Sequence, residues 1–174
     1  MSFFYKKISA PNHDTVKSLV LTAIDSFAEA EQFGDVANTD WHLPQHITRP
    51  YQSPISTFLY WPLVAEYRAM GGTNLEVVTC WFQQYNSGDI HHWHNHPGVH
   101  FTNIYYVEYP DGSPQTEFID PENPKNIIKI DVKEGDILIV PAHVIHQSPS
   151  VTTSFGRKTV VVLNTNLLYR PDQP

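Results

Sequence analysis

The sequence has almost no cysteine and no long apolar run. Cys80 is the single thiol among its 174 residues, so no internal disulfide can form, which favours a reducing cytoplasm. No apolar run approaches the roughly 18 residues that a membrane-spanning helix needs. The N-terminal stretch MSFFYKKIS has an apolar patch but lacks the longer apolar segment of a secretory signal. We therefore expect a cytoplasmic protein with no membrane partner.

Charged residues are also scarce, and positive charge is the scarcer kind. They make up 17% of the chain, and 11 Lys and Arg against 18 Asp and Glu give a net charge of −7. Because an acidic surface repels phosphate backbones and anionic lipid, nucleic acid is not an expected partner. The sequence leaves open a homodimer formed through an exposed sheet edge or the region around Trp41.

The length and a change of pattern along the chain predict one domain, residues 1–174, with two layers. Apolar residues recur at helical spacing over 14–33. A second, shorter helix is expected to begin near Pro62, since proline is tolerated at the first helical position, and to end at Gly71. These helices would make residues 1–72 a helical N-terminal layer.

Residues 73–168 have a different residue pattern, which is typical of β-strands. Short runs of β-branched and aromatic residues alternate with turn residues such as those of 86–88. The expected strands are 75–84, 101–109, 115–119, 126–132, 136–140 and 157–165. Strands at this spacing indicate a closed or two-sheet antiparallel structure, of which a jelly roll is one form. The predicted fold class is mainly β with N-terminal helices.

Histidine is crowded into one short segment. Five of the ten histidines lie in residues 91–100, HHWHNHPGVH. His94 and His96 are two residues apart, so in a strand they share one face and can bind one metal ion. The expected third ligand is His146, which follows an apolar strand and a proline, and His143 is the competing choice. A nitrogen-rich site with open positions suits Fe(II), and less specifically Zn, Ni, Cu or Mn.

The other histidines of this segment are expected to lie outside the metal coordination. In a regularly alternating strand, His91 points to the face opposite His94 and His96. His100 follows the break made by a proline and a glycine. We therefore expect His91, His92 and His100 to be supporting or surface residues.

Arg157 is a further candidate functional residue, one suited to binding a carboxylate. It lies eleven positions after His146 and opens the apolar run RKTVVVLNT. A guanidinium at the head of a buried strand needs an anionic partner, and a carboxylate held through two parallel hydrogen bonds suits its geometry. The residues alone leave two interpretations open: a bound ligand carboxylate, or an ordinary ion pair with an acidic neighbour.

Several motifs, in their order and spacing, resemble those of one known family. They are HNHP, NIYY, FIDP, GDILIVP followed by His146, and the strand from Arg157 to Asn164. Together, over about residues 75–166, they are similar to the 2-oxoglutarate/Fe(II) oxygenases found in bacteria and their phages. The resemblance implies a double-stranded β-helix, which is a jelly-roll, cupin-like barrel, over residues 73–168. The protein would act in the cytoplasm, or in the host cytoplasm if a phage encodes it.

The resemblance also implies an enzyme. Such a dioxygenase uses Fe(II) and 2-oxoglutarate to hydroxylate a substrate, which this sequence does not identify. His94, His96 and His146 would hold the iron, and Arg157 would pair with the far carboxylate of 2-oxoglutarate. The usual proximal motif of the wider superfamily is H-x-D, so His96 stands where a carboxylate is expected. The metal would then keep its full 2+ charge.

Three more residues are implied as contacts of the cosubstrate. Asn103 or Tyr106, in the strand that resembles the family's SGVYY segment, would hydrogen-bond 2-oxoglutarate. Thr159, two residues after Arg157, would help to hold its far carboxylate.

Two other classes of protein remain open. The segment GDILIVPAHVIH also resembles the second cupin motif, so the main alternative is a cupin-type metal-binding protein or metalloenzyme that does not use 2-oxoglutarate. The first cupin motif needs a glutamate shortly after H-x-H, and residues 97–103 contain none. The other class is a non-catalytic β-sandwich with bound metal. Arg157 separates these classes, because only the oxygenase gives it a required task.

Overall fold

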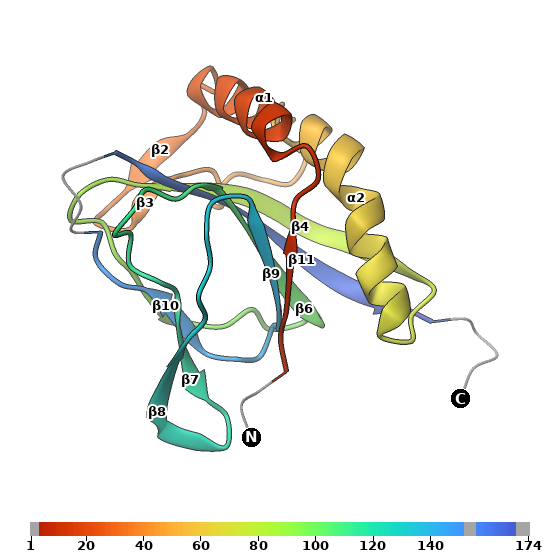
Figure 1. The fold of residues 1–174 in the computed structure, drawn as a ribbon. Coiled ribbons are helices and arrows are strands. Elements are labelled where there is room, and N and C mark those ends of the chain that lie inside the picture. The colour runs from red at the N-terminus through yellow and green to blue at the C-terminus, as the bar shows by residue number, and fades with distance from the viewer. Residues whose placement is uncertain (1–3, 152–155, 170–174) are drawn as a thin grey trace.

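The protein folds into two antiparallel β-sheets and two helices (Figure 1). The computed structural model describes residues 4–151 and 156–169. The helices are α1 (His13–Asp25) and α2 (Gln52–Ala69). The strands are β1 (Lys6–Ser9), β2 (Glu31–Phe33), β3 (Ala37–Thr39), β4 (Asn74–Tyr85), β5 (His91–His94), β6 (Phe101–Glu108), β7 (Glu117–Asp120), β8 (Asn123–Lys129), β9 (Asp136–Pro141), β10 (His146–Ser148) and β11 (Lys158–Leu168).

The strands form a major and a minor sheet. The major sheet has seven strands in the order β1-β9-β6-β11-β4-β3-β2, and the minor sheet has four in the order β5-β10-β7-β8. Figure 1 shows α1 and α2 on one side of the major sheet and β10 and β7 on the other. The predicted mainly β, antiparallel two-sheet fold with N-terminal helices is confirmed. The segment 1–72 is not wholly helical, since β1 extends one edge of the major sheet while β3 and β2 extend the other.

Helix α1 is shorter than the predicted 14–33. It ends at Asp25 because the Phe27 N–H donates to the Ile24 carbonyl at 3.0 Å and the Ser26 hydroxyl donates to the Ala23 carbonyl at 3.1 Å. This tight last turn directs Phe27 into the core. The residues expected to continue the helix instead reach β2.

Helix α2 begins ten residues earlier than predicted. Proline was expected at its start, but Pro62 lies inside the helix, where it removes one backbone hydrogen-bond donor. The buried side chains Ile55, Leu59 and Leu63 recur every four residues and form one continuous apolar stripe. Burial of this stripe on the major sheet outweighs the cost of the proline.

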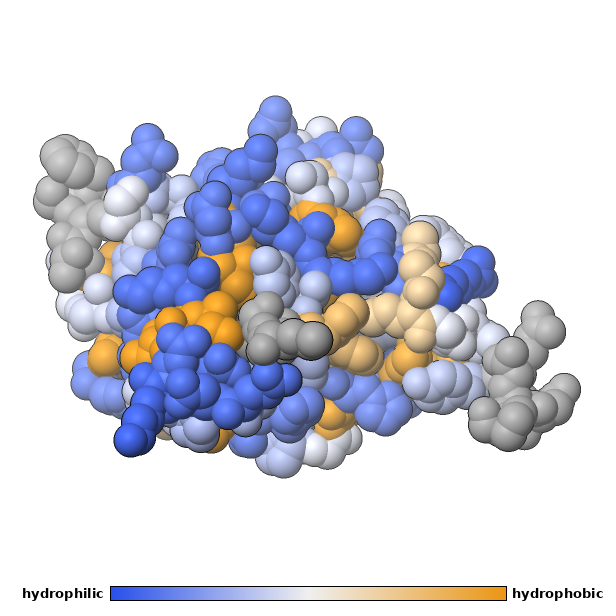
Figure 2. All heavy atoms as spheres, turned by 60° about the horizontal axis from the view of Figure 1, so that its bottom comes forward, coloured by the Kyte–Doolittle hydropathy of each residue, from blue (hydrophilic) through white to orange (hydrophobic). Residues whose placement is uncertain are grey.

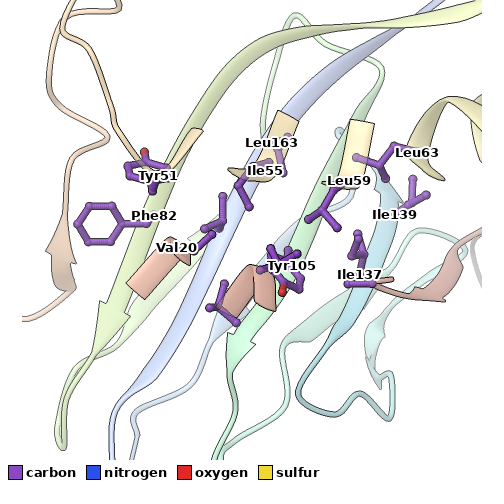
Figure 3. Packing of buried hydrophobic residues seen from close by; sticks show 14 of the residues in the cluster. Val20, Tyr51, Ile55, Leu59, Leu63, Phe82, Tyr105, Ile137, Ile139 and Leu163 are labelled. Carbon is purple, nitrogen blue, oxygen red and sulfur yellow. The ribbon is translucent and has the colours of Figure 1, made fainter. Parts of the chain in front are cut away.

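Two apolar cores lie on the two faces of the major sheet. The first fills the space between the helices and the sheet, and Figure 3 shows Ile55 and Leu59 of α2 pointing toward Tyr105, Ile139 and Leu163 of the strands. The second fills the space between the two sheets, and it includes Ile104, Tyr106, Phe118, Leu138, Val140, Val160 and Val162. Alternate residues of β6 and β11 therefore belong to different cores. Only every second side chain of these strands can face the space between the two sheets.

A buried ion pair fixes the irregular segment before α2 to strand β4. Asp40 Oδ2 accepts hydrogen bonds from Arg49 Nε and Tyr51 Oη, each at 2.6 Å. Asp40 Oδ1 accepts the Phe82 N–H at 3.0 Å. Arg49 also donates to the carbonyls of Asp40 and Leu43. The charges of both partners are thus satisfied without solvent.

The surface is polar over the face shown in Figure 2, where hydrophilic residues predominate and hydrophobic ones form separate patches. Within the described ranges, neither helix combines the length and the apolar character needed to cross a bilayer.

Replacing Arg49 by alanine is expected to destabilise the fold by about 3–5 kcal/mol, because it leaves the Asp40 carboxylate buried without its counter-charge. Urea unfolding followed by fluorescence would measure this change. As a control, Lys6→Ala removes the more exposed Lys6–Glu66 pair and should cost at most about 1 kcal/mol. Equal effects of the two substitutions would contradict the role given to Arg49.

Candidate metal centre and adjoining pockets

The three histidines predicted as ligands converge at one end of the minor sheet. His94 ends β5, His96 follows it, and His146 begins β10. β5 and β10 pair directly, with His146 opposite His94. The His96 N–H donates to the Ala142 carbonyl at 2.9 Å, which holds the turn in place. One ring nitrogen from each histidine lies within 4.8 Å of the others. This spacing allows the three nitrogens to bind one metal ion.

Hydrogen bonds on the outer side of the rings direct the inner nitrogens toward the common centre. His94 Nδ1 donates to the His92 carbonyl at 2.6 Å, and His146 Nδ1 donates to the Val144 carbonyl at 3.0 Å. In each ring the proton then resides on Nδ1, so Nε2 presents a lone pair. Partners of this kind fix the tautomer and orientation that a metal ligand needs.

Asn164 lies beside the third ring, that of His96. Its side-chain Nδ2 lies 3.4 Å from His96 Nδ1, and its Oδ1 accepts a hydrogen bond from the Thr102 hydroxyl at 3.0 Å. A carboxamide can turn either its oxygen or its nitrogen toward a neighbour. A flip of this amide would let its oxygen accept the His96 Nδ1–H and its nitrogen donate to Thr102, which would leave His96 Nε2 with a lone pair for a metal.

The three candidate ligand histidines are neutral at neutral pH. Burial and the adjacent imidazoles lower the pKa of His96 to about 3 and that of His146 to about 4. Burial also lowers the pKa of His94. Since neutral imidazole is the form that binds metals, protons do not compete for this site near pH 7.

His91 does not point away from this group, contrary to the expectation from regular alternation. Its ring stacks on that of His94 with centroids 3.9 Å apart, and the Gln83 amide lies 2.8 Å from its Nδ1. The cause is a register shift: His146 pairs with His94 and Ser148 with His91, so two steps along β10 match three along β5. A bulge of this kind turns the next side chain to the same face.

The remaining candidates lie elsewhere. His92 and His143 are exposed, and His100 accepts a hydrogen bond from the Leu167 N–H at 3.0 Å. Of the two choices for the third ligand, the structure places His146 with His94 and leaves His143 outside.

Lys158 is the cation that faces the histidines. It lines a narrow inner pocket together with His94, His96 and His146, and the residue is only 2% exposed. Its Nζ donates to Ser148 Oγ at 2.9 Å and to the Pro114 carbonyl at 3.3 Å. Nζ also lies over the rings of Tyr85 and Tyr109, at 5.2 and 5.6 Å from their centroids. No carboxylate of the described residues pairs with it.

A buried ammonium without a counter-charge is costly, and burial lowers the pKa of Lys158 to about 7. Its partner Ser148 and the candidate ligand His146 are two residues apart on β10, hence on one face and about 7 Å apart along the strand. An anion that reached from the metal position toward Ser148 would supply the missing charge.

Arg157 and Thr159 are not brought to the histidines. Arg157 Nε donates to Glu108 at 2.9 Å and its Nη1 to Asp25 at 2.8 Å, and the Thr159 hydroxyl also donates to Glu108. The expected contact of these residues with a cosubstrate is therefore not met in this geometry, and the ion-pair interpretation of Arg157 describes it. The reason is alternation along β11, which turns Lys158 toward the pocket and Thr159 toward the helices.

Asn103 and Tyr106 do not line the inner pocket either. Asn103 faces the helices, where it accepts a hydrogen bond from Tyr67 Oη at 3.2 Å and donates to the Leu163 carbonyl. Tyr106 faces the space between the sheets, and its hydroxyl lies 3.0 Å from that of Thr116. Since Thr116 lines the pocket, Tyr106 supports the wall from one residue away.

Sequence reasoning missed Lys158, Asn164 and Gln83. The detectable signal is strongest for Lys158, a lysine at the head of the apolar run TVVVL; Gln83 and Asn164 have polar neighbours in their strands. Lys158 stands next to Arg157, and the sequence does not say which of two neighbours faces inward, because that depends on the register with β4 and β6.

Two pockets meet at the histidines. The inner one, which contains Lys158, is narrow, with a volume of about 30 Å³. The outer one has a volume of about 410 Å³. Both are bordered by Trp81, Gln83, His91, His94 and His96. The candidate metal position therefore lies between an enclosed space with a cation and a wider space toward solvent.

Comparison with known proteins gives one family. The profile described as "Putative 2OG-Fe(II) oxygenase" matches residues 79–131. No curated protein matches the sequence closely enough to count as a relative. The matched segment contains His94 and His96 with the strands around them.

Solved structures share the fold at low sequence identity. The viral collagen prolyl hydroxylase of Paramecium bursaria Chlorella virus-1, in its 2-oxoglutarate complex, has 14% identity and a TM-score of 0.61, covering 95% of this chain and 96% of that one. The α-ketoglutarate-dependent epimerase SnoN of nogalamycin biosynthesis has 11% identity and a TM-score of 0.73, covering 96% and 81%. A Trichoplax adhaerens prolyl hydroxylase has 16% identity and a TM-score of 0.63, covering 92% and 82%.

These comparisons confirm the resemblance seen in the sequence and the jelly-roll fold. The expected enzyme class, a 2-oxoglutarate/Fe(II) oxygenase, is that of the family whose model matches residues 79–131. The cofactors predicted from the sequence, Fe(II) and 2-oxoglutarate, are those of the matched family, and the histidine triad fits such a metal.

Alanine substitution of His94, His96 or His146 should each weaken metal binding by at least tenfold, because each removes one of three nitrogen ligands. His143→Ala and His100→Ala should leave it within about twofold, since both side chains lie outside the group. Anaerobic Fe(II) titration of the five variants would measure this. Wild-type affinity in any of the first three would exclude that histidine as a ligand.

Lys158 should make stability depend on pH. Its pKa is about 7 in the folded chain and about 10.5 when unfolded, so between these values the unfolded state binds more protons. The free energy of unfolding should therefore rise with pH above about 7, by up to about 1.4 kcal/mol per pH unit. Urea unfolding at pH 7, 8 and 9 would show this slope in the wild type and in the exposed control Lys125→Met, but not in Lys158→Met. Parallel slopes in all three would contradict the burial of an uncompensated charge.

Proposed function

We propose that the chain hydroxylates a C–H bond of an organic substrate, with Fe(II) bound by His94, His96 and His146 and 2-oxoglutarate anchored by Lys158. The overall reaction converts substrate, dioxygen and 2-oxoglutarate into hydroxylated product, succinate and carbon dioxide. Iron with 2-oxoglutarate supplies the oxidising chemistry. The protein residues bind and orient the reactants and keep the reacting space dry.

The observation that carries this proposal is the buried ammonium of Lys158 beside the triad. It has hydrogen-bond partners in Ser148 and the Pro114 carbonyl but no carboxylate among the described residues. A cupin-type site that binds only metal has no use for such a cation. A dicarboxylate that also reaches the metal position would supply the negative charge that balances the Lys158 ammonium.

The geometry suits a five-carbon dicarboxylate. Ser148, which binds the Lys158 ammonium, lies about 7 Å along β10 from His146. One end of 2-oxoglutarate can therefore lie at the triad while its far carboxylate accepts hydrogen bonds from Lys158 and Ser148. The inner pocket is narrow, so the surrounding side chains have to move outward when this ligand binds.

The all-histidine ligand set supports an anionic cosubstrate. Three neutral imidazoles leave the 2+ charge of a metal undiminished, whereas a carboxylate in place of His96 would offset part of it. Lys158 adds a further positive charge when protonated. An anion is thus attracted at both of its ends.

Substitution of Lys158 by methionine tests this function. The variant should bind 2-oxoglutarate more weakly by about 2–5 kcal/mol, the range for removing one partner of a buried charge pair, while Fe(II) affinity stays within about threefold. Arg157→Ala is the matched control: it should keep wild-type affinity for 2-oxoglutarate and lose about 1 kcal/mol or less of stability, as expected for a partly exposed ion pair.

The measurement is an anaerobic titration that follows the visible absorption band of the Fe(II)–2-oxoglutarate chelate. If Arg157→Ala loses the band and Lys158→Met keeps it, the original sequence assignment holds and Lys158 is not the anchor. If wild-type protein with bound Fe(II) never forms the band, the oxygenase proposal fails and a cupin-type metalloprotein takes its place.

A further inference from the structure

The outer side of the metal position carries two buried polar atoms with no protein partner among the described residues: Thr79 Oγ1 and Trp81 Nε1. Both side chains come from β4 and are two residues apart, so they share one face of the strand. Both border the outer pocket. Buried polar groups almost always have hydrogen-bond partners, so this pair points to a ligand that supplies them.

The register of β4 and β11 orders the site along its length. Lys158 pairs with Tyr85 at the inner end, and Asn164 pairs with Thr79 at the outer end. The Trp81 ring lies 5.5 Å from that of His96, centroid to centroid. The unsatisfied atoms therefore lie on the side of the triad that is opposite Lys158, where a substrate has to approach.

A second space of about 410 Å³ adjoins the outer pocket on the side of α2. The two spaces have Trp41, Thr79 and Trp81 in common, and Trp41 is half exposed. Each space is of the size of small-molecule sites. A ligand that fills both would be elongated and would contact Trp41 and Trp81.

The walls of both spaces carry no free charge. The outer pocket is lined by no Asp, Glu, Lys or Arg among the described residues. The adjoining space has one charged residue, Arg49, which is already paired with Asp40. The rest of its lining is uncharged and combines apolar side chains such as Ile55 and Leu63 with neutral polar ones such as Gln52. A charged substrate would be left without a counter-charge there.

The exposed edge of β4 is partly covered by side chains. The Cys80 carbonyl accepts the Gln52 amide at 3.1 Å, the Leu75 carbonyl accepts Tyr60 Oη at 3.4 Å, and the Phe82 N–H is bound by Asp40. Side chains thus occupy three of the backbone groups that strand addition would use, which disfavours a peptide at this edge.

From these observations we infer that the substrate is an uncharged, elongated small molecule with a mainly apolar body, and that an oxygen acceptor on it binds the Trp81 N–H and the Thr79 hydroxyl. This inference rests on the proposed function for the reaction, but the binding itself needs neither iron nor 2-oxoglutarate. The hydrogen bonds would hold the apolar body against Trp41 and present a nearby carbon to the metal position.

Calorimetric titration with three probes of one carbon skeleton tests the inference: 2-acetylnaphthalene, 2-ethylnaphthalene and the 1-(2-naphthyl)ethylammonium cation. Trp81→Phe and Thr79→Val each remove one polar group and keep most of the shape. Each should weaken binding of the ketone by about 3- to 10-fold, as expected for one lost hydrogen bond. The affinity for the ethyl compound should stay unchanged. The cation should bind more weakly than the ketone.

Thr57→Val, on the exposed face of α2, is the control and should change none of these affinities. Equal weakening of the ketone and the ethyl compound would overturn the hydrogen-bond assignment. Absence of ketone binding, tighter binding of the cation, or tighter binding of a capped tetra-alanine peptide would overturn the substrate class.

The Fe(II)–2-oxoglutarate band, measured on the same variants, separates this inference from the proposed function. Both variants should form it as the wild type does. If the band forms but the ketone does not bind, only the substrate inference is contradicted. If the ketone binds but no band forms, only the oxygenase proposal is contradicted.

Discussion

The pairing of β11 with both of its neighbours is the constraint on which the site depends. β11 bonds to β4 on one side and to β6 on the other, so its rotation about its own axis is fixed. Lys158 and Asn164 consequently point between the sheets, one at each end of the site. A slip of one residue would turn Thr159 into the pocket and Lys158 toward the helices. The inward positions of Lys158 and Asn164 therefore share one cause.

The minor sheet supplies the other half of the site. Its bulge between β5 and β10 brings His91 onto His94, and its pairing sets His146 opposite His94. Burial keeps the imidazoles neutral, while the ammonium of Lys158 gives the inner pocket a positive charge. The outer pocket, bordered by Trp81, is lined by no Asp, Glu, Lys or Arg of the described residues. The site therefore changes along its length from a narrow pocket with a buried lysine to a wider pocket without such a side chain.

The fold and the convergence of three histidines were largely predictable, because their signals are local. Short β-branched and aromatic runs between turn residues predicted the main strands, and the H-x-H pair with a distant His146 predicted which histidines come together. The start of α2 was not predictable from Pro62, since burial of a continuous apolar stripe on the sheet outweighed the local penalty of a proline. His91 was misplaced because a bulge depends on the partner strand, which local alternation does not contain.

The sequence by itself determined which chemical groups are available: three histidines at metal-binding spacing, a cation at the head of the last long strand, and apolar strands to bury them. Only the tertiary structure decided that this cation is Lys158, with Arg157 held outside by Glu108 and Asp25. The physical reason is that neighbouring residues of a strand face opposite sides. Which of them faces inward is set by hydrogen bonds to strands that lie far away in the sequence.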